Sequence, residues 1–250
     1  MLLKLLKYDF RAMWKHFSLI WGAALTLGLV NRFTRFHFHS ILDNDLTVIV
    51  FAGVVVAMFV ISISFVIDRF SKGLLGSEGY LMHTLPVRSW QLVLSKLVCG
   101  AVTWVISGVV AILAILIMGG LNWSFLVNFL FWKDVVEVIS KHPDNLLLVL
   151  EFCLFLASVI FQFIAAIYLS ASIGHLFARR HRLAAIAAFI GIYALMPNVW
   201  MLFEDLIWQG MNPDATVHSN LLAGTAAMLI PAAVFLAGVC WILDHKLNLE

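Results

Sequence analysis

Charged residues are scarce in this sequence. Asp, Glu, Lys and Arg make up 12% of its 250 residues, whereas hydrophobic residues make up 63% and the mean hydropathy is +1.00. Soluble domains have about 45–50% apolar and about 25% charged residues. This composition excludes a soluble domain and predicts an all-α integral membrane protein. At about 20 residues for each spanning helix, the chain has room for roughly six spans and for no separate catalytic domain.

The sequence also lacks the short motifs of enzymes that act alone. Gly73, Gly76 and Gly79 have neither the spacing of a phosphate-binding loop nor the lysine that follows its glycines. No Gly-x-Ser-x-Gly elbow, His-Glu-x-x-His helix or pair of intramembrane carboxylates occurs either. We therefore predict that the chain is not an enzyme and that it carries no cofactor or metal of its own.

Cysteine is rare, and its placement does not indicate a disulfide or metal framework. Cys99, Cys153 and Cys240 all fall within apolar runs, where cysteine acts as a small hydrophobic side chain. His37 and His39 form a His-x-His pair, but two histidines alone make a weak metal site. A solvated loop is the favoured interpretation of that pair.

The first 16 residues are basic and amphipathic. Four cations recur at spacings of three and four residues, which places them on one helical face: Lys4, Lys7, Arg11 and Lys15. We predict an interfacial elbow helix over residues 1–16, with its cations toward anionic lipid headgroups. The alternative is a secretory signal peptide with Phe17–Val30 as its apolar core, but no small-x-small cleavage site precedes Asn31.

Six apolar stretches are predicted to span the membrane. They are Phe17–Val30, Leu46–Ile67, Leu97–Met118, Leu146–Ser170, Leu183–Trp200 and Leu221–Leu243. Pro197 and the acidic pair Glu204 and Asp205 mark the predicted exit of the fifth span, and Pro231 predicts a kink near the centre of the sixth. Residues 121–145, between the third and fourth spans, are amphipathic, which predicts an outer interfacial helix or a partly re-entrant hairpin.

The distribution of positive charge predicts that both termini are cytoplasmic. In that orientation twelve cations lie inside: Lys4, Lys7, Arg11, Lys15, Arg69, Lys72, Arg88, Lys96, Arg179, Arg180, Arg182 and Lys246. Four lie outside: Arg32, Arg35, Lys133 and Lys141. Because cytoplasmic loops of membrane proteins carry an excess of Lys and Arg, the loops 68–96 and 171–182 are predicted to be cytoplasmic.

The longest of these loops, Asp68–Lys96, has signals for a short helix of its own. Ser77 can cap that helix, Pro86 ends it, and Ser89 can cap the helix that follows. Four apolar, aromatic or hydroxyl residues share one face of it: Tyr80, Leu81, Thr84 and Leu85. Such a helix, held parallel to the membrane between two spans, is suited to filling a groove on a partner protein.

The same loop resembles a known family. Its segments Glu78-Gly79-Tyr80-Leu81, Thr84-Leu85-Pro86-Val87 and Ser95-Lys96 are similar to the EGYL…TLPV…SK signature of permease subunits of bacterial ABC exporters of the Gram-positive type. The resemblance also covers the elbow helix, the six spans and the two cytoplasmic loops. It implies a coupling helix that enters a cleft of a separate ATPase subunit.

The resemblance implies two sets of contacts with that ATPase. The coupling-helix contacts are Glu78, Gly79, Tyr80, Leu81, Thr84, Leu85, Pro86, Val87 and Arg88. The second coupling loop contributes His175, Arg179 and Arg180. ATP and Mg²⁺ are then expected on the partner, and two identical or similar permeases are expected to pair in the bacterial cell membrane. No nucleic-acid partner is expected.

By the same resemblance the exported compound is amphipathic or hydrophobic, such as a peptide toxin or antimicrobial. Glu151 and Gln162 are candidate polar contacts along its route, because polar groups inside spans are costly to keep. Glu151 lies near the outer end of its span, so it can instead reach toward water or pair with a neighbouring helix.

Two other functions stay open. An ion-coupled secondary carrier needs an ionisable residue near mid-membrane and a repeat of broken helices. Glu151 is shallow, and no internal repeat is evident. A non-transporting immunity or sensor subunit that recruits an ATPase is the other alternative.

Overall fold

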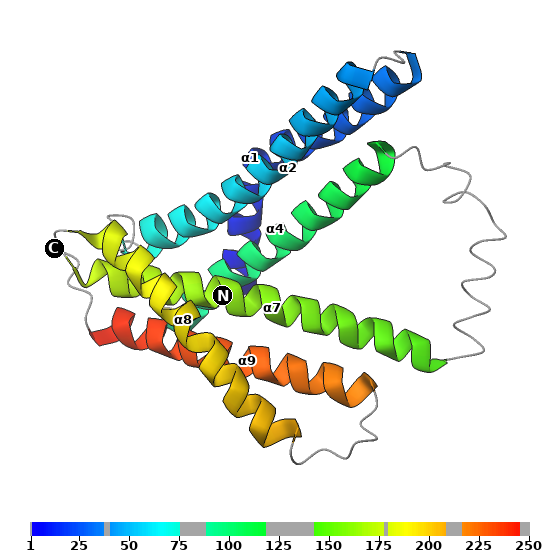
Figure 1. Ribbon diagram of the computed structural model, residues 1–250. Coiled ribbons are helices and arrows are strands. Elements are labelled where there is room, and N and C mark those ends of the chain that lie inside the picture. The colour runs from blue at the N-terminus through cyan, green and yellow to red at the C-terminus, as the bar shows by residue number, and fades with distance from the viewer. Residues whose placement is uncertain are drawn as a thin grey trace. The chain divides into compact units, whose positions relative to one another are not determined.

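The computed structural model describes residues 2–37, 41–75, 89–118, 143–177, 180–208 and 217–245 (Figure 1). The regular structure in these ranges is entirely helical. The elements are α1 (Leu2–His37), α2 (Ile41–Phe70), the π-helical turn η1 (Ser71–Leu75), α4 (Ser89–Met118), α7 (Pro143–His175), α8 (His181–Trp208) and α9 (Val217–His245). The predicted all-α fold is confirmed for the part of the chain that these ranges cover.

Four of these helices are long and apolar enough to cross a membrane: Ile49–Leu74, Ser89–Met118, Leu146–His175 and Val217–His245. They have 26 to 30 residues. At 1.5 Å per residue they cover about 39–45 Å, which exceeds the roughly 30 Å hydrocarbon core. The membrane-helix character predicted from composition is therefore confirmed. Six spans and cytoplasmic termini stay predictions.

The N-terminal helix is longer than the sequence predicts. α1 runs without interruption from Leu2 to His37, so the predicted elbow 1–16 and the first predicted span Phe17–Val30 form one helix. The junction, Trp14-Lys15-His16-Phe17-Ser18, contains neither Gly nor Pro, so no local signal ends the helix there. Amphipathicity marks a change of environment along this helix and not an end of it.

α8 also extends beyond its predicted end. Pro197 lies inside the helix, which continues to Trp208, so this proline does not end the helix. The membrane exit marked by Pro197, Glu204 and Asp205 stays a prediction. A proline removes one backbone hydrogen bond, which bends a helix more often than it ends one when the flanking residues are apolar helix formers. Pro231 likewise lies inside α9 and is buried.

The chain forms two compact units. Unit 1 comprises Met1–Leu5, Val66–Ala101 and Pro143–Glu250, and unit 2 comprises Leu6–Phe65 and Val102–His142. The boundary between the units falls inside α2 and inside α4, so each of these helices has residues in both units. Apolar runs predict whole helices, and they therefore do not reveal a boundary that lies within a helix.

Unit 2 packs α1 against α2 and α4. Phe17 of α1 lies edge-on to Phe65 of α2 with ring centroids 5.1 Å apart, and the Trp21 indole donates a 3.0 Å hydrogen bond to Ser107 of α4. At Gly28 a Cβ would lie 2.9 Å from the backbone oxygen of Ala114, so the two backbones touch. Small residues allow this close approach of apolar helices.

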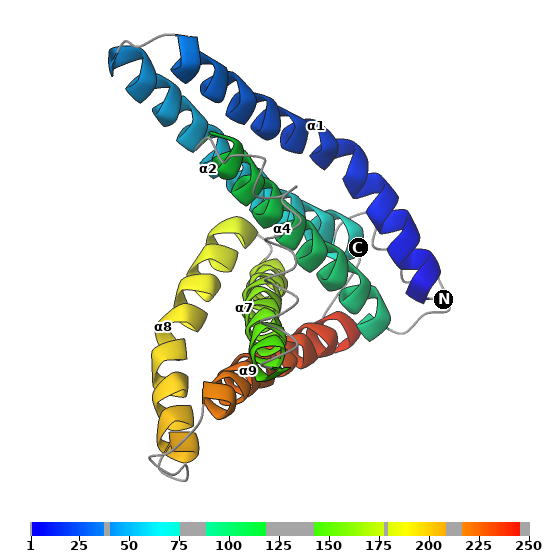
Figure 2. The same ribbon diagram turned by 90° about the vertical axis from the view of Figure 1, so that its right-hand side faces the viewer.

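Unit 1 is centred on α7, which packs against both α8 and α9 (Figure 2). Three α7–α9 contacts are nearly evenly offset in sequence: Glu151 with His218, Phe155 with Gly224, and Leu169 with Gly238. A constant offset means that α7 and α9 run parallel. α8 also packs on α7, where Phe163 of α7 contacts both Phe189 and Tyr193 of α8.

Candidate functional site

The structure describes the two arms of the Asp68–Lys96 loop. These are Asp68–Leu75 and Ser89–Lys96, which we call the loop base. The predicted coupling-helix residues Glu78–Arg88 lie outside the described residues, as does Arg179. The loop base is therefore the part of the candidate site whose geometry can be stated.

The first arm ends in the π-helical turn. α2 continues to Phe70 and is followed by η1 over Ser71–Leu75, and short π segments occur often at functional positions. Phe70 and Leu74 are fully buried, four residues apart on one face. The Phe70 ring stacks on Tyr168 of α7 with centroids 4.1 Å apart. These contacts fix the first arm to α7.

The exposed face of the first arm carries an ion pair. The Lys72 ammonium lies 2.9 Å from the Asp68 carboxylate one turn earlier, and both side chains are exposed. An exposed pair of this kind is screened by solvent and contributes little to stability. The first arm is instead fixed in place by the buried side chains of Phe70 and Leu74.

The second arm is more deeply buried than a membrane anchor. Leu92, Val93 and Leu97 are buried, and the side chain of Lys96, one of the cations counted on the cytoplasmic side, is only 4% exposed. A Cβ at Gly73 would lie 3.7 Å from Cε of Lys96, so the lysine stem passes over the π-helical turn. The two arms are thus in contact at Gly73 and Lys96.

The second arm is also linked to the end of α9. The Ser89 hydroxyl, at the first residue of α4, donates a hydrogen bond to the Asp244 carboxylate. Negative charge is favourable at a helix N-terminus because the first backbone amides point toward it. Asp244 therefore joins the start of α4 to the last turn of α9.

The second predicted coupling loop lies at the turn from α7 to α8. His175 and Arg180 are exposed, and the His175 and His181 rings are 5.6 Å apart. The amides of Leu176 and Phe177 donate 3.1 Å hydrogen bonds to the carbonyls of Ile173 and Gly174, which makes the turn tight. This turn belongs to the same compact unit as the loop base.

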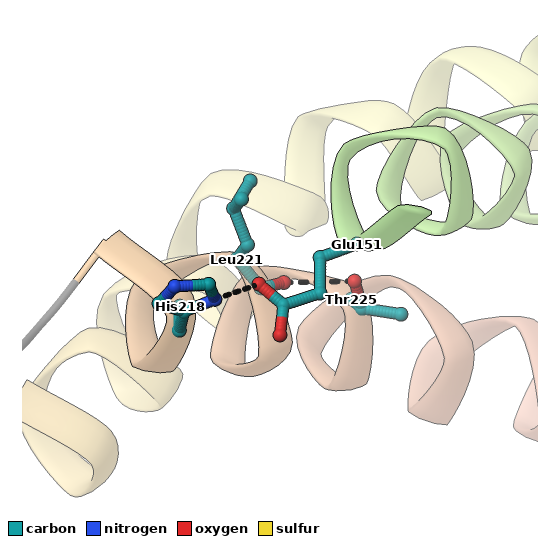
Figure 3. A network of polar contacts seen from close by, with 4 residues as sticks. All are labelled: Glu151, His218, Leu221 and Thr225. Atoms are coloured by element: carbon teal, nitrogen blue, oxygen red, sulfur yellow. Dashed lines mark hydrogen bonds and ion pairs between the residues drawn. The ribbon is translucent and has the colours of Figure 1, made fainter. Parts of the chain in front are cut away.

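Glu151 pairs with a residue that the sequence did not single out. Nδ1 of His218, in the first turn of α9, lies 2.8 Å from a carboxylate oxygen of Glu151 (Figure 3). The side chains are 11% exposed for Glu151 and 29% for His218. Of the alternatives open for Glu151, pairing with a neighbouring helix is the one observed.

Gln162 is buried on the same helix, about one turn beyond Ser158, whose hydroxyl donates a 2.7 Å hydrogen bond to the Phe155 carbonyl. Within the described ranges, no group of three or more His, Cys, Asp or Glu side chains is arranged to hold a metal ion.

Comparison of the chain with protein-family models, curated proteins and solved structures gives no match. The functional interpretation therefore depends on the residues and contacts of this chain.

Sequence reasoning missed three features of the site. Lys96 carries no signal for burial, because a lysine after a polar loop is typical of an exposed anchor. His218 and Asp244 act through partners 67 and 155 residues away, so neither contact has a local signature. The available signal was a general one: polar residues at the ends of apolar helices tend to find partners on neighbouring helices.

Proposed function

We propose that this chain is the transmembrane subunit of an ATP-driven ABC exporter whose ATPase resides on separate subunits. The observation that carries the proposal is the EGYL…TLPV…SK signature. Its first two segments lie in sequence between the two arms of the loop base, its Ser95-Lys96 segment belongs to the second arm, and both arms belong to one compact unit. The apolar helices and the twelve-to-four bias of positive charge support the same assignment.

The loop base is suited to passing on a displacement of the loop. Phe70, Leu74, Leu92 and Leu97 are fully buried, and close-packed groups transmit a shift to their neighbours because there is little free volume to absorb it. The Phe70–Tyr168 stack leads to α7.

The Ser89–Asp244 bond leads from the second arm to α9. A push on residues 76–88 would therefore reach two apolar helices that are not adjacent to the loop in sequence.

In the proposed cycle, ATP binding closes a pair of ATPase subunits around the coupling helices of two permeases, identical or similar. The closure moves the arms of each loop, and the spans rearrange to open a route for an amphipathic or hydrophobic compound. The bacterial cell membrane is the proposed location. ATP and Mg²⁺ bind to the partner subunits in this scheme.

The proposal is tested by affinity purification of the tagged chain from the membranes of its host cell. An ABC-type ATPase is expected to copurify and to be lost when Glu78→Lys is combined with Leu85→Asp, because this change removes both charge and apolar contact from the predicted coupling helix.

The matched control is Glu204→Lys with Leu206→Asp, which makes the same changes at the predicted outer end of the fifth span. Retention of the ATPase by the coupling-helix variant, with its hydrolysis still responsive to the membrane subunit, contradicts the assignment.

One observation favours a second candidate, an ion-coupled carrier: Glu151 and His218 form a titratable pair between two apolar helices. Uptake in sealed vesicles separates the two, since a carrier responds to an imposed ion gradient without ATP. Substrate-stimulated ATP hydrolysis separates an exporter from a non-transporting immunity or sensor subunit.

A further inference from the structure

We infer that Glu151 is a binding site for a basic group, an ammonium or guanidinium, of the exported amphipathic compound, and that His218 occupies the carboxylate when the compound is absent. The inference rests on the proposed function, which it extends by naming the chemical class of the substrate.

The Glu151 carboxylate has a partner that is charged only under some conditions. A carboxylate inside an apolar helix is costly unless it is paired. In the described part of the chain, the recorded partner of Glu151 is His218. Histidine is a conditional counter-ion, since it carries charge only when protonated. A lysine or arginine in its place would hold the carboxylate permanently and leave no opening for an incoming cation.

The Glu151 carboxylate has acceptor capacity beyond its contact with His218. The contact with His218 uses one carboxylate oxygen, and the other points away from the imidazole (Figure 3). The nearby Thr225 hydroxyl does not compete, because it donates a 2.8 Å bond to the carbonyl of Leu221. A carboxylate accepts about four hydrogen bonds, so acceptor capacity is left for a donor from a ligand.

The neighbours of Glu151 on the same side of α7 are aromatic and aliphatic. Phe155 lies one turn beyond Glu151 on the same helical face, where its ring rests 3.1 Å from the position of a Cβ at Gly224. A carboxylate followed by an aromatic ring is a combination that binds organic cations, through charge and through the ring face. Leu147 and Leu154, on the same side of α7, are exposed and can receive an alkyl chain.

Ca²⁺ and Mg²⁺ do not fit the surroundings of Glu151. Ca²⁺ takes six to eight oxygen ligands, and Mg²⁺ requires near-octahedral geometry. The described residues offer no cluster of three acidic, histidine or cysteine ligands. One carboxylate beside apolar and aromatic groups fits a cation whose remaining atoms are hydrocarbon.

The test uses photolabelling of the purified chain in non-ionic detergent. One probe is an alkylamine that carries a diazirine in its chain, and the other is the alcohol of the same length. Peptide mapping should place the amine label on residues 143–177 or 217–245. Glu151→Gln should reduce amine labelling by about tenfold, which is the loss of roughly 1.4 kcal/mol of binding free energy. Alcohol labelling should be unchanged.

His218→Gln separates binding from a purely structural role. Both substitutions break the ion pair, so a structural role predicts that both lower the labelling equally. A binding role predicts that His218→Gln retains or increases amine labelling, because it frees the carboxylate, and that Glu151→Asp restores part of it. Helicity and apparent unfolding temperature of each variant show whether the chain remains folded.

Equal losses in the two variants, or equal labelling by amine and alcohol, would overturn the inference. So would full displacement of the amine probe from Glu151 by phosphatidylethanolamine, which would place the cation source in the bilayer. The measurement needs no ATPase, so its failure leaves copurification unaffected, and absence of a copurifying ATPase leaves the labelling result in place.

Discussion

Gly174 lies where α7 turns into α8, and the space beside it is already filled. A Cβ there would lie 2.6 Å from both Cβ of Ala185 and the carbonyl oxygen of His181, and 2.9 Å from the Ala185 amide nitrogen. Two of these three atoms belong to the backbone, which cannot move aside as a flexible side chain can. A single missing methyl group thus permits the tight α7–α8 hairpin.

Gly174→Ala is therefore expected to destabilise the chain by about 1–3 kcal/mol, the usual cost of overpacking. The measurement is the apparent unfolding temperature in detergent. Gly191→Ala in α8 is the matched control, since its Cβ would meet nothing within 4 Å. That control is expected to be neutral or stabilising by about 0.5–1 kcal/mol, because alanine is the better helix former. Equal effects of the two substitutions would contradict the close packing at Gly174.

Lys96 and Glu151 show what single residues contribute to prediction. Both were recognised from sequence as polar residues beside apolar runs, since composition is a local property. The burial of Lys96 over Gly73 and the pairing of Glu151 with His218 depend on how distant segments meet. The polar character of Lys96 and Glu151 was therefore predictable from the sequence, whereas the burial of Lys96 and the partner of Glu151 were not.

At the scale of elements, the start of α4 and the end of α9 are joined by one side-chain bond, Ser89 to Asp244. We expect Ser89→Ala and Asp244→Ala each to reduce the response of ATP hydrolysis to substrate, while the ATPase still copurifies. Because both remove the same contact, the double variant should be no worse than either single one.

Lys72→Gln is the control for this element, since it breaks an exposed ion pair on the other arm and should leave the response nearly unchanged. Additive effects of the two α4–α9 substitutions would show that the contact does not act as a unit.

Helix ends were less predictable than helices. The apolar runs identified the spans inside α2, α4, α7 and α9 because hydrophobicity is read over a window of about 19 residues. The continuity of α1 through residue 16 and the extension of α8 from Trp200 to Trp208 were missed. In both places the predicted boundary followed a change between apolar and polar residues, which does not itself end a helix.

At the scale of the whole chain, the parallel course of α7 and α9 fixes which ends share a side of the membrane. Pro143 and Val217 begin these two helices, so they lie on one side if both helices span, and His175 and His245 lie on the other. This agrees with the predicted alternation of spans without establishing the direction.

Cysteine labelling tests the direction. In a background without Cys99, Cys153 and Cys240, single cysteines at Ser140 and Asn212 should react with an impermeant maleimide added to intact cells. Cysteines at Ser77 and Asn248 should react only after permeabilisation, because the positive charge predicts them inside. Labelling of Ser140 and Asn212 from opposite sides would contradict the parallel course of α7 and α9.

The missing side chain at Gly224 restricts how α9 can slide along α7. Phe155 lies against a residue without a side chain, one turn along from the pair of Glu151 and His218. Sliding α9 along α7 by one turn, about 5.4 Å, would place a side chain against the Phe155 ring where Gly224 now lies. The same movement would separate His218 from Glu151. Two contacts of unrelated chemistry thus select the same register of α7 and α9. A small slide of one helix along the other would break both contacts, so these helices favour discrete registers over continuous sliding.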